Sequence, residues 1–579
     1  MPLTLDPAFA ALGTEHGMSL RLVEVLARRN VSALELATYF APPLASLGDP
    51  ALLPDAEVFM ARIAGAQSSG ERVMVFGDFD ADGLTGLAIL TRALRMTGLE
   101  VLPDVPRRLE EGHGLSLAAL DAARESGIRL IVTVDCGSSS VAEIHEARTR
   151  GIDVIVTDHH RIPPERPPAL ALVNPMRTDS RYPHQRLSGS GVAFKLAQLL
   201  LADLPGGAAA ALQFADLASI GTVADVSSIL GENRAIARLG LDQMRSAPRA
   251  GIAALLERAG IAPAAVTLET IAFALAPRIN AAGRIGEPAD AAALLLSDDA
   301  EEARDLAARL DEANVTRRQM TRDVVADAEL SIGQINADAP AIIAHGPWPV
   351  GIVGLVASRL AERLGRPAVV GADLGDAIRA SCRSVEGFDL AEALRACGDL
   401  FTRYGGHAGA AGFELPAERW PAFVEQFSAL AAARLPPDPR PELRLDLALP
   451  ALDVDYLLLR ELAMLAPTGP GNPDPLIAIF GLTVTRVRAA SGGHTQLTLK
   501  RRIDVLDGIA FDRADLAASL REGDRLDVVA RVRSRSFAGY ESLQLDIRDV
   551  APTGWHAARA VGPAAGVVPG THALAGASA

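Results

Sequence analysis

The sequence predicts an α/β protein of several domains: a parallel-sheet domain, a long connecting helix, a mixed α/β domain and a small β-barrel. Three observations lead to this prediction. From about residue 71, short β-rich runs alternate with helix-like segments. Residues 301–332 contain neither glycine nor proline, and residues 440–550 carry a series of short strand-like runs. A chain of 579 residues also has room for more than one hydrophobic core.

The first predicted domain rests on five β-rich runs: "RVMVFG", "LEVLPDV", "IRLIVTVD", "IDVIVTD" and "ALALVNP". Helix-like segments such as "GLAILTRALRMTG" and "SSVAEIHEARTRG" separate them. Strand, helix and strand at this spacing indicate a parallel sheet with helices on both faces. Because ligands of such sheets bind beyond the carboxyl ends of the strands, we expect the functional residues at that edge.

The remaining chain follows a different pattern. Small or apolar residues recur along 301–332 at helical spacing, which predicts one long amphipathic helix. Runs such as "GLTVTRVRAAS" and "HTQLTLKR" predict the barrel, and the Ala/Gly-rich end predicts a disordered tail. The expected segments are an N-terminal helical segment, a catalytic domain, connecting helices, a mixed α/β domain, the barrel and the tail: 1–50, 51–265, 266–332, 333–437, 438–552 and 553–579.

The composition is that of an ordinary globular protein, with 49% apolar and 22% charged residues. Three cysteines without metal-ligand spacing suit a reducing cytoplasm, and we expect neither a signal peptide nor a membrane span. The net charge of −15 argues against indiscriminate coating of DNA. It does not exclude a local arginine-lined groove on an acidic protein.

Acidic and imidazole side chains follow several predicted strands. They are Asp78, Asp80 and Asp82 in "GDFDADG", Asp135 in "VTVDCGS", Asp158, His159 and His160 in "VTDHH", and Asp225 in "GTVADV" after a helical segment. In an extended segment alternate residues face one side, so we expect the first three aspartates to converge. Without cations these carboxylates would raise one another's pKa values and weaken the fold.

Divalent cations remove this repulsion, and carboxylates with a neutral imidazole suit Mn²⁺ or Mg²⁺. About six such groups exceed the needs of one ion, whereas two ions about 3.5–4 Å apart fit them and suit attack on phosphorus. A calcium loop is disfavoured, because the twelfth position counted from Asp78 is Ile89. Taken singly, Asp135 could instead be a helix N-cap, and adjacent histidines are often surface residues.

The motifs together resemble the DHH phosphoesterase superfamily and, within it, the RecJ family of bacterial single-strand-specific 5′→3′ DNA exonucleases. Beyond "GDFDADG", "VDCG" and "DHH", the matching motifs extend in the family's order over roughly residues 20 to 550. They are "LSGSGVAFKLAQLL" (187–200), "GTVADV" (221–226), "APRINAAGRIG" (276–286), "GIVGLVASRL" (351–360), "SCRS" (381–384), "YGGHAGAAGF" (404–413) and "GPGNPDP" (469–475). The resemblance implies a DHH domain, a connecting helix, a DHHA1 domain and an OB-fold.

The resemblance also implies roles for the candidate residues. The implied metal ligands are Asp80, Asp82, Asp135, His159 and Asp225, with Asp135 between the two ions. Asp78 and Asp158 are either ligands or partners of ligands. His160 would face the scissile phosphate and orient it or stabilise its developing charge.

Substrate contacts are expected outside the metal site. Glycines of "YGGHAGAAG" would let the backbone approach a phosphate, and arginines match phosphate oxygens. The candidates are Arg108, Arg278, Arg284, Ser381, Arg383, Gly405, Gly406 and His407. The alternatives are a flexible glycine loop and arginines that form ordinary surface salt bridges. In the barrel, arginines with Phe537 and Tyr540 could bind single strands, or the two rings could fill the interior.

Three positions depart from the family pattern: Arg107, His113 and Pro470. None of them is an expected metal ligand, so the expected reaction type is unaffected, whereas the way the strand is held could differ. We therefore expect a two-metal exonuclease that releases 5′-mononucleotides from single-stranded DNA. The resemblance implies work beside a helicase and a single-strand-binding protein in DNA repair and recombination, and we expect a monomer.

Two other functions fit parts of the sequence. A phosphodiesterase for nano-RNA or cyclic dinucleotides would use the same ligands, but such relatives are usually shorter and lack the "GPGNPDP" barrel. An inactive DNA-binding scaffold should have lost ligands, and here the full set remains.

Overall fold

The computed structural model describes residues 6–106, 114–333, 339–435, 442–537, 540–555 and 567–569. The chain divides into two compact units, each made of separate stretches. Unit 1 comprises Met1–Phe40, Thr321–Ala466 and Pro473–Ser578, and unit 2 comprises Ala41–Met320 and Pro467–Asn472. The domains expected from the sequence therefore do not map one to one onto these units.

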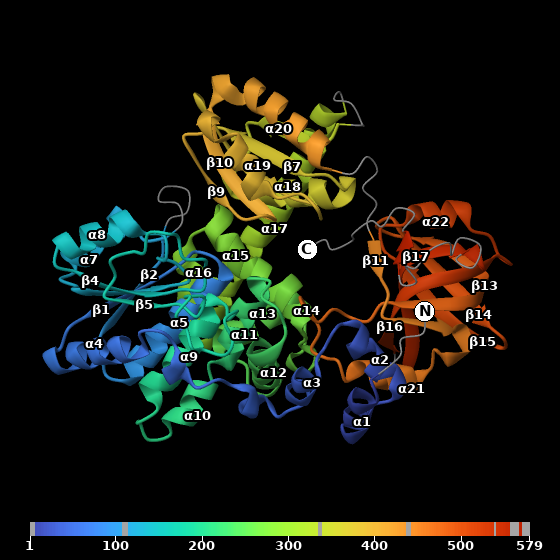
Figure 1. Ribbon diagram of the computed structural model, residues 1–579, viewed down its shortest axis with the longest axis horizontal. Coiled ribbons are helices and arrows are strands. Elements are labelled where there is room, and N and C mark those ends of the chain that lie inside the picture. Colours follow the sequence, from blue (N-terminus) through green and yellow to red (C-terminus); the bar gives the residue numbers. More distant parts are fainter. Residues whose placement is uncertain are drawn as a thin grey trace. The chain divides into compact units, whose positions relative to one another are not determined.

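Unit 2 contains the five-stranded parallel sheet, in the order β2-β1-β3-β4-β5, as the alternating runs predicted (Figure 1). Its strands are β1 (Val73–Gly77), β2 (Val101–Asp104), β3 (Leu130–Val134), β4 (Asp153–Thr157) and β5 (Ala171–Val173). Its helices up to the end of the sheet region are η1 (Pro43–Ser46), η2 (Pro50–Leu52), α4 (Ala56–Ser69), α5 (Ala81–Met96), α7 (Leu117–Glu125), α8 (Val141–Thr149) and α9 (Gly189–Leu201). The carboxyl ends of all five strands lie at one edge, because the strands are parallel.

Each face of this sheet covers a separate hydrophobic core. Residues such as Val75, Val132 and Ile155 point towards α4, α5 and α9, whereas Met74, Ile131 and Val154 point towards α7 and α8. This alternation follows from the two-residue period of a strand. Helix α5 is buried almost all round, which explains why "LTGLAIL" carries no charged residue.

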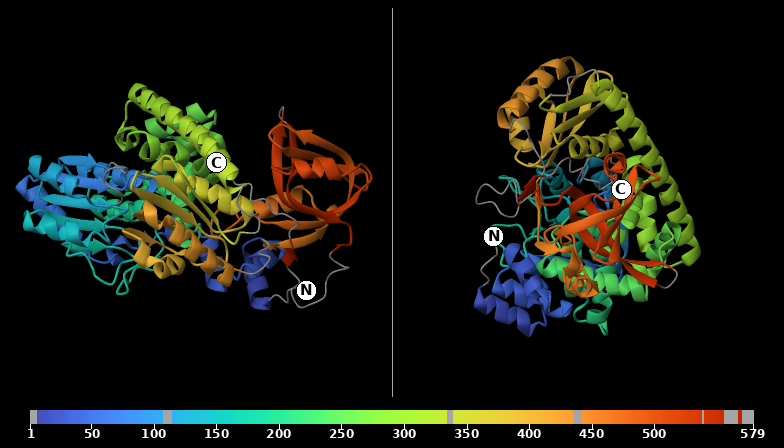
Figure 2. Two further views of the ribbon diagram at one scale, coloured as in Figure 1. Left: turned by 90° about the horizontal axis from the view of Figure 1, so that it is seen from above. Right: turned by 90° about the vertical axis from the view of Figure 1, so that its right-hand side faces the viewer.

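The rest of unit 2 after α9 is helical. It consists of α10 (Gly207–Leu212), α11 (Ala215–Ala224), α12 (Gly231–Ser246), α13 (Ala250–Ala259), η3 (Pro263–Ala265), α14 (Leu268–Thr270), the π-helical turn η4 (Ile271–Leu275), α15 (Ala276–Ile285) and α16 (Pro288–Leu296). The connecting helix follows as α17 (Ala300–Ile332), close to the predicted range, and Figure 2 shows it as one uninterrupted helix.

Unit 1 contains a second sheet, in the order β6-β7-β8-β10-β9, which is the mixed α/β domain expected after α17. Only β6 and β7 are parallel within it. Its elements are β6 (Ile342–Gly346), α18 (Val350–Leu364), β7 (Ala368–Asp373), β8 (Ala377–Arg383), α19 (Leu390–Ala396), η5 (Gly398–Leu400), β9 (Arg403–Gly406), β10 (Ala410–Pro416), η6 (Ala417–Arg419) and α20 (Trp420–Arg434). One face packs on α19 and α20 through a core that includes Phe413, Phe423 and Phe427.

The predicted barrel is also present. Five strands close on themselves in the order β13-β14-β15-β17-β16, because β13 pairs with both β14 and β16. The region comprises β11 (Glu442–Arg444), β12 (Leu447–Pro450), η7 (Ala451–Asp453), α21 (Tyr456–Ala463), β13 (Ile477–Ala490), β14 (His494–Arg501), β15 (Asp504–Ala510), α22 (Ala514–Ser519), β16 (Arg525–Phe537) and β17 (Tyr540–Pro552). A short strand β18 (Val567–Pro569) pairs with β11 and lies within the segment that the sequence assigned to a tail.

The N-terminal helices α1 (Pro7–Glu15), α2 (Leu20–Arg28) and α3 (Ala33–Tyr39) agree with the helical prediction for this segment. They contact the barrel region. Arg29 forms a buried ion pair with Asp446 (Nε–Oδ1, 2.7 Å), and the Tyr39 hydroxyl donates to the Leu465 carbonyl. The sequence alone had not indicated this pairing across more than 400 residues.

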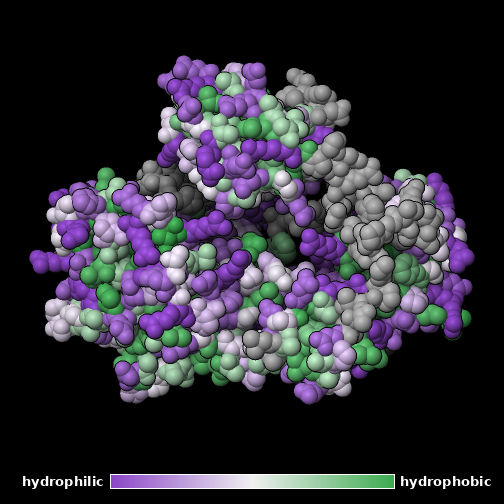
Figure 3. Space-filling view, viewed as in Figure 1, coloured by the Kyte–Doolittle hydropathy of each residue, from purple (hydrophilic) through white to green (hydrophobic). Residues whose placement is uncertain are grey.

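One stretch, Gly207–Ala224, is long and apolar enough to span a membrane, but 67% of it is buried inside the protein. Its second part, α11, is one of the core helices of unit 2. In the view of Figure 3, hydrophobic residues are scattered among hydrophilic ones over the parts that are drawn in colour.

Candidate metal centre

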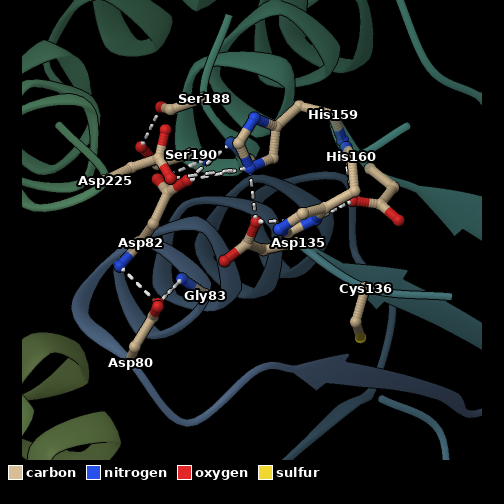
Figure 4. A network of polar contacts seen from close by, with 12 residues as sticks. Asp80, Asp82, Gly83, Asp135, Cys136, His159, His160, Ser188, Ser190 and Asp225 are labelled. Carbon is tan, nitrogen blue, oxygen red and sulfur yellow. Dashed lines mark hydrogen bonds and ion pairs between the residues drawn. The ribbon is translucent and has the colours of Figure 1, made fainter. Parts of the chain in front are cut away.

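The carboxyl edge of the parallel sheet gathers the acidic and imidazole residues that the sequence singled out (Figure 4). Nε2 of His159 lies 3.0 Å from Oδ1 of Asp135, 3.8 Å from Oδ2 of Asp82 and 3.9 Å from Oδ1 of Asp225. Three sets of ligand atoms, each set lying within 4.8 Å, could hold a cation. They are Asp78, Asp80 and Asp135; Asp82, His159 and Asp225; and Asp135, His159 and His160.

The first motif does not converge in the way that we expected. Strand β1 ends at Gly77 and α5 begins at Ala81, so the backbone turns from extended to helical between Asp78 and Asp82. The side chain of Asp82 therefore joins His159 and Asp225, whereas Asp78 and Asp80 join Asp135. The expectation of one continuous extended segment was wrong, and the turn divides the three aspartates between two groups.

Helix ends hold the carboxylates of the first motif. Asp80 is the N-cap of α5, and its Oδ1 accepts hydrogen bonds from the amides of Asp82 and Gly83. Asp82 accepts from the amides of Gly189 (2.7 Å) and Ser190 (2.9 Å) at the start of α9. Helix N-termini favour negative charge, so these amides are suitable hydrogen-bond donors for the two carboxylates.

Glycines let the helices approach these carboxylates closely. A Cβ on Gly189 would lie 2.6 Å from Oδ1 of Asp135, and one on Gly221 would lie 2.3 Å from Oδ1 of Asp82. The motifs "LSGSG" and "GTVADV" thus have a physical explanation, because only glycine leaves room at these two positions.

Asp135 follows β3 in a left-handed conformation with a φ of 61°. Such a backbone is uncommon for a residue other than glycine and is often found at functional sites. The alternative role as a helix N-cap does not apply, since Ser140 precedes the next helix, α8. The strand end therefore presents the Asp135 carboxylate to the other acidic groups.

Two buried atoms at the centre lack protein partners. Oδ1 of Asp135 and Nε2 of His159 have no hydrogen-bond partner among the described residues, although they face one another at 3.0 Å. Unpaired buried polar atoms are costly unless something else binds them. A divalent cation accepts both carboxylate oxygen and imidazole nitrogen, so this pair fits a metal site.

The pKa values reflect the crowding of negative charge. Burial raises the pKa of Asp135 well above its usual value, and the carboxylates of Asp82 and Asp80 raise it further. Burial, with the charges of Asp78 and Asp82, raises the pKa of Asp80 to about 6. Two like charges 4 Å apart repel by about 4 kcal/mol at an effective dielectric of about 20, so cations are needed to offset the cost.

Asp158 differs from the other aspartates. Its Oδ1 accepts from the amides of His159 and His160 and from Nδ1 of His160 (2.8 Å), and its Oδ2 accepts from the amide of Ser138. Asp158 is absent from all three candidate sets. Its hydrogen bond raises the pKa of His160 to about 9 and fixes the proton on Nδ1.

Asp225 ends α11 and lies opposite His159. The amides of Val226 and Ser227 donate to the carbonyls of Val223 and Thr222, which is the Schellman pattern of a helix C-terminus. Val226 occupies the left-handed position where glycine is usual, with a φ of 61°. The hydroxyl of Ser227 donates to Oδ2 of Asp225 (2.5 Å), which leaves Oδ1 directed at His159.

Some predicted substrate contacts lie elsewhere in unit 2. Nε of Arg278 forms an ion pair with Asp311 of α17 (2.8 Å), which is the salt-bridge alternative that the sequence left open. Arg284 is half-buried in the last turn of α15. Arg108, together with Arg107 and His113, lies outside the described residues, and so do the side chains of Phe537 and Tyr540.

A residue that the sequence reasoning missed is Asn280 of α15. Its Oδ1 accepts a hydrogen bond from the amide of Ala81 (2.7 Å), the first residue of α5. Gly283, one turn further on, contacts the backbone of Phe79 closely, since a Cβ there would lie 2.8 Å from its carbonyl oxygen. The sequence analysis had singled out the arginines of "PRINAAGR". In the structure, the asparagine and the glycine of this motif contact the acidic motif "GDFDADG".

The remaining predicted contacts lie on the second sheet, in unit 1. Ser381 and Arg383 of β8 point to the face covered by α18, where a Cβ on Gly354 would lie 3.0 Å from the Ser381 hydroxyl. In register, Ser381 pairs with Gly412, and Gly412 pairs with Gly405. Gly412 and Gly405 have no side chains, so no side chain covers the sheet next to Ser381 at these two positions.

"YGGHAGAAG" is therefore a hairpin and not a flexible glycine loop. Gly405 and Gly406 end β9, His407 lies in the turn, and all three are exposed. Arg383 donates to the Ser381 hydroxyl (3.3 Å) and the Cys382 carbonyl (2.8 Å) but has no carboxylate partner within the described part of the chain. Burial lowers its pKa, as expected for a cation without a counter-ion.

Comparisons with known proteins agree with this arrangement. Residues 72–222 match the DHH family's N-terminal domain, residues 338–433 the DHHA1 domain and residues 445–549 the RecJ OB domain. The single-stranded-DNA-specific exonuclease RecJ of Thermus thermophilus is 38% identical, over 88% of this chain and 72% of that protein. The chain belongs to the RecJ family.

Other RecJ proteins are similar over comparable lengths. The protein of Bacillus subtilis is 35% identical over 92% of this chain and 68% of its own length, and that of Escherichia coli is 35% identical over 83% and 88%. A crystal structure of Thermus thermophilus RecJ in complex with Mn²⁺ superposes with a TM-score of 0.81 at 33% identity, covering 95% of this chain and 78% of that one.

Proposed function

We propose that this protein is a metal-dependent exonuclease that degrades single-stranded DNA in the 5′→3′ direction and releases 5′-mononucleotides. The observation that supports this most directly is the meeting of Asp82, Asp135, His159 and Asp225 at the carboxyl edge of the sheet. Two buried atoms there have no hydrogen-bond partner among the described residues. The RecJ relatives named above are single-stranded-DNA-specific exonucleases.

We infer that two divalent ions, Mn²⁺ or Mg²⁺, are held by the candidate sets. Asp78, Asp80 and Asp135 would bind one ion, and Asp82, His159 and Asp225 the other, with Asp135 and His159 adjacent at their boundary. The ions would withdraw charge from the phosphodiester and lower the pKa of the attacking water. Asp158 would act through His160, because its oxygens are already engaged.

His160 is suited to contact the scissile phosphate. Its side chain is 58% exposed, and Asp158 holds Nδ1, so Nε2 is the nitrogen presented to substrate. A protonated imidazole donates to a phosphate oxygen and stabilises the charge that develops in the transition state. Asp82, held by the amides of Gly189 and Ser190, needs no rearrangement before reaction.

The face of the second sheet is the proposed phosphate-binding surface for the DNA backbone. Arg383 has no carboxylate partner among the residues that the structure describes, Ser381 supplies a hydroxyl, and Gly405 and Gly406 leave the backbone accessible. His407, at the turn of the hairpin, and Arg284 of α15 are further proposed contacts, and Arg108 and Arg278 stay predictions. The barrel would bind the single strand beyond the cut site, as OB-folds do.

We propose that the protein is a cytoplasmic monomer that works with a helicase and a single-strand-binding protein in repair and recombination. A polymeric substrate is favoured over a dinucleotide because the chain carries the barrel matched by the RecJ OB domain.

A digestion time course tests the proposal. Single strands labelled at the 5′ or the 3′ end are incubated with the full chain and Mn²⁺, beside a blunt duplex of the same sequence. We expect the 5′ label to appear at once in mononucleotides, while the 3′ label stays in long products and the duplex resists digestion. The Asp135→Ala variant should leave both labels intact.

Three results would count against it: early release of the 3′ label, internal cleavage, or undiminished digestion by Asp135→Ala. Equal turnover of a dinucleotide and a long strand would favour the small-substrate alternative.

A further inference from the structure

The segment Pro467–Asn472 belongs to unit 2, although the residues on either side of it belong to unit 1. It contains the first four residues of "GPGNPDP", a motif that the metal centre described above does not use. Six residues from the C-terminal half of the chain are therefore part of the unit that carries the acidic cluster.

These residues form a rigid turn. The amide of Gly469 donates to the Asn472 carbonyl (2.8 Å), and the amide of Asn472 donates back to the Gly469 carbonyl (3.0 Å). Pro470 at the second position and Gly471, with a φ of 75°, at the third are the residues that a type II turn favours. The buried Asn472 side chain donates to the Pro467 carbonyl (2.9 Å) and closes the turn.

The turn packs on the loop that follows Asp225. The Ile229 amide donates to the Pro470 carbonyl (2.7 Å), a contact that does not depend on the side chain at position 470. Gly469 and Gly471 pack closely against this loop. A Cβ on Gly469 would lie 2.7 Å from Ile229, and a Cβ on Gly471 would lie 3.1 Å from Ser228.

The same loop carries the strained part of the metal centre. Val226 is β-branched and holds a left-handed backbone, which is rarely adopted without support from its surroundings. Ser227 orients Asp225 through a hydrogen bond, and only Ser228 separates it from Ile229. Arg234 of α12, which follows this loop, donates to the Pro467 carbonyl (2.9 Å).

We propose that Pro467–Asn472 is a clamp that positions Asp225 for cation binding, with Gly469 and Ile229 as its main contact. This inference rests on the proposed function, because it takes Asp225 as a metal ligand. The clamp holds the loop from Val226 to Leu230 in its strained form, and that form directs Oδ1 of Asp225 at His159. No residue of the clamp belongs to the candidate ligand sets, so within this proposal the clamp acts through Asp225.

The test compares Mn²⁺ binding by full-length variants, using calorimetric titration of metal-free protein with Mn²⁺ alone. In Gly469→Ala the added methyl pushes Ile229 and should weaken binding at one site about tenfold, as loss of a partner behind a ligand does. In Gly469→Ala/Ile229→Ala the clashing Cγ1 is gone, so binding should recover to within about threefold of the parent.

The matched control is Gly65→Ala, since nothing lies within 4 Å of a Cβ at that position of α4. Thermal unfolding of each metal-free variant separates loss of fold from loss of metal affinity. Should Gly469→Ala fail to fold, Asn472→Ala loosens the turn without adding volume and is expected to weaken binding in the same direction.

Wild-type Mn²⁺ binding by Gly469→Ala, with or without a lower unfolding temperature, would overturn the clamp. So would failure of the double variant to recover while it remains folded. Unchanged Mn²⁺ binding by Asp225→Ala would instead remove Asp225 from the ligand set and contradict the proposed function itself.

Discussion

The acidic cluster of unit 2 and the arginine face of unit 1, which is the side of the second sheet that carries Ser381 and Arg383, hold opposite charges and are built in different ways. In the cluster, buried carboxylates are crowded together and held by helix N-termini, strained strand ends and close-packed glycines. On the arginine face, side chains are few, and glycines of β9 and β10 leave the sheet open beside Ser381 and Arg383. The carboxylates of the cluster repel one another, whereas Arg383 has no counter-ion in the described ranges of the chain.

The contrast indicates how each region contributes to function. Crowded carboxylates gain stability only when cations bind, so the acidic cluster should couple folding stability to metal. A single arginine without a counter-ion costs less and responds to an anionic ligand, so the arginine face should affect substrate affinity alone. Variants in the two regions should therefore differ in which measurement they change.

The largest effect is expected for Asp135→Asn. Without this carboxylate two of the three candidate sets lose a ligand, and exonuclease activity should fall by a factor on the order of 10³ or more. The metal-free variant should nevertheless be more stable, by about 1–2 kcal/mol, because a buried negative charge has been removed. Thermal unfolding in chelator, beside the activity assay, checks both, and a less stable metal-free variant would contradict this account of the cluster.

The second-largest effect is expected for Gly221→Ala, a substitution that removes no polar group. Its methyl would lie 2.3 Å from Asp82 and 2.1 Å from the Ser190 hydroxyl, so the carboxylate must move. We expect activity to fall about 10–100-fold and Mn²⁺ to stabilise the variant less than the parent. Gly65→Ala, in an open position, serves as the control and should behave as wild type.

On the other side of the comparison, Arg383→Ala should raise the KM for single strands with little change in kcat. Loss of a charge-assisted contact is expected to cost about 1.5–3 kcal/mol, or roughly 10–150-fold in kcat/KM. Arg379, on the same strand and face, is neutralised by Glu414 (2.8 Å), so Arg379→Ala is the matched control with a small effect. Equal effects of the two substitutions would show that the missing counter-ion is irrelevant.

The smallest effect concerns the ion pair of Arg278 and Asp311. If the pair is only structural, Arg278→Ala and Asp311→Ala should each lower stability by about 1 kcal/mol or less and leave kcat/KM near the parent value. If Arg278 contacts DNA, only the arginine variant should raise KM. A double-mutant cycle on unfolding and on kcat/KM separates these outcomes.

Local sequence pattern was enough to predict the parallel strands, the long helix and the barrel of this protein. Alternating apolar runs predicted the parallel strands, and the stretch without glycine or proline predicted α17. Acidic residues after strands predicted a candidate site at the sheet edge where the structure brings these groups together. These features depend on neighbours in sequence, since backbone period and burial are set within a few residues. The same reasoning failed at "GDFDADG", where the change from strand to helix could not be located closely enough to separate Asp82 from Asp78.

Only the tertiary structure decided which distant residues meet. Asn280 binds the start of α5, Arg278 pairs with Asp311, the N-terminal helices join the barrel region, and Pro467–Asn472 supports the loop after Asp225. No local sequence signal identifies these partners. Asn280 or the Pro470 carbonyl would have the same sequence neighbours whether or not it formed its long-range contact. The types of residue in the candidate site could therefore be predicted from the sequence. The contacts that position these residues form only when distant parts of the chain pack together.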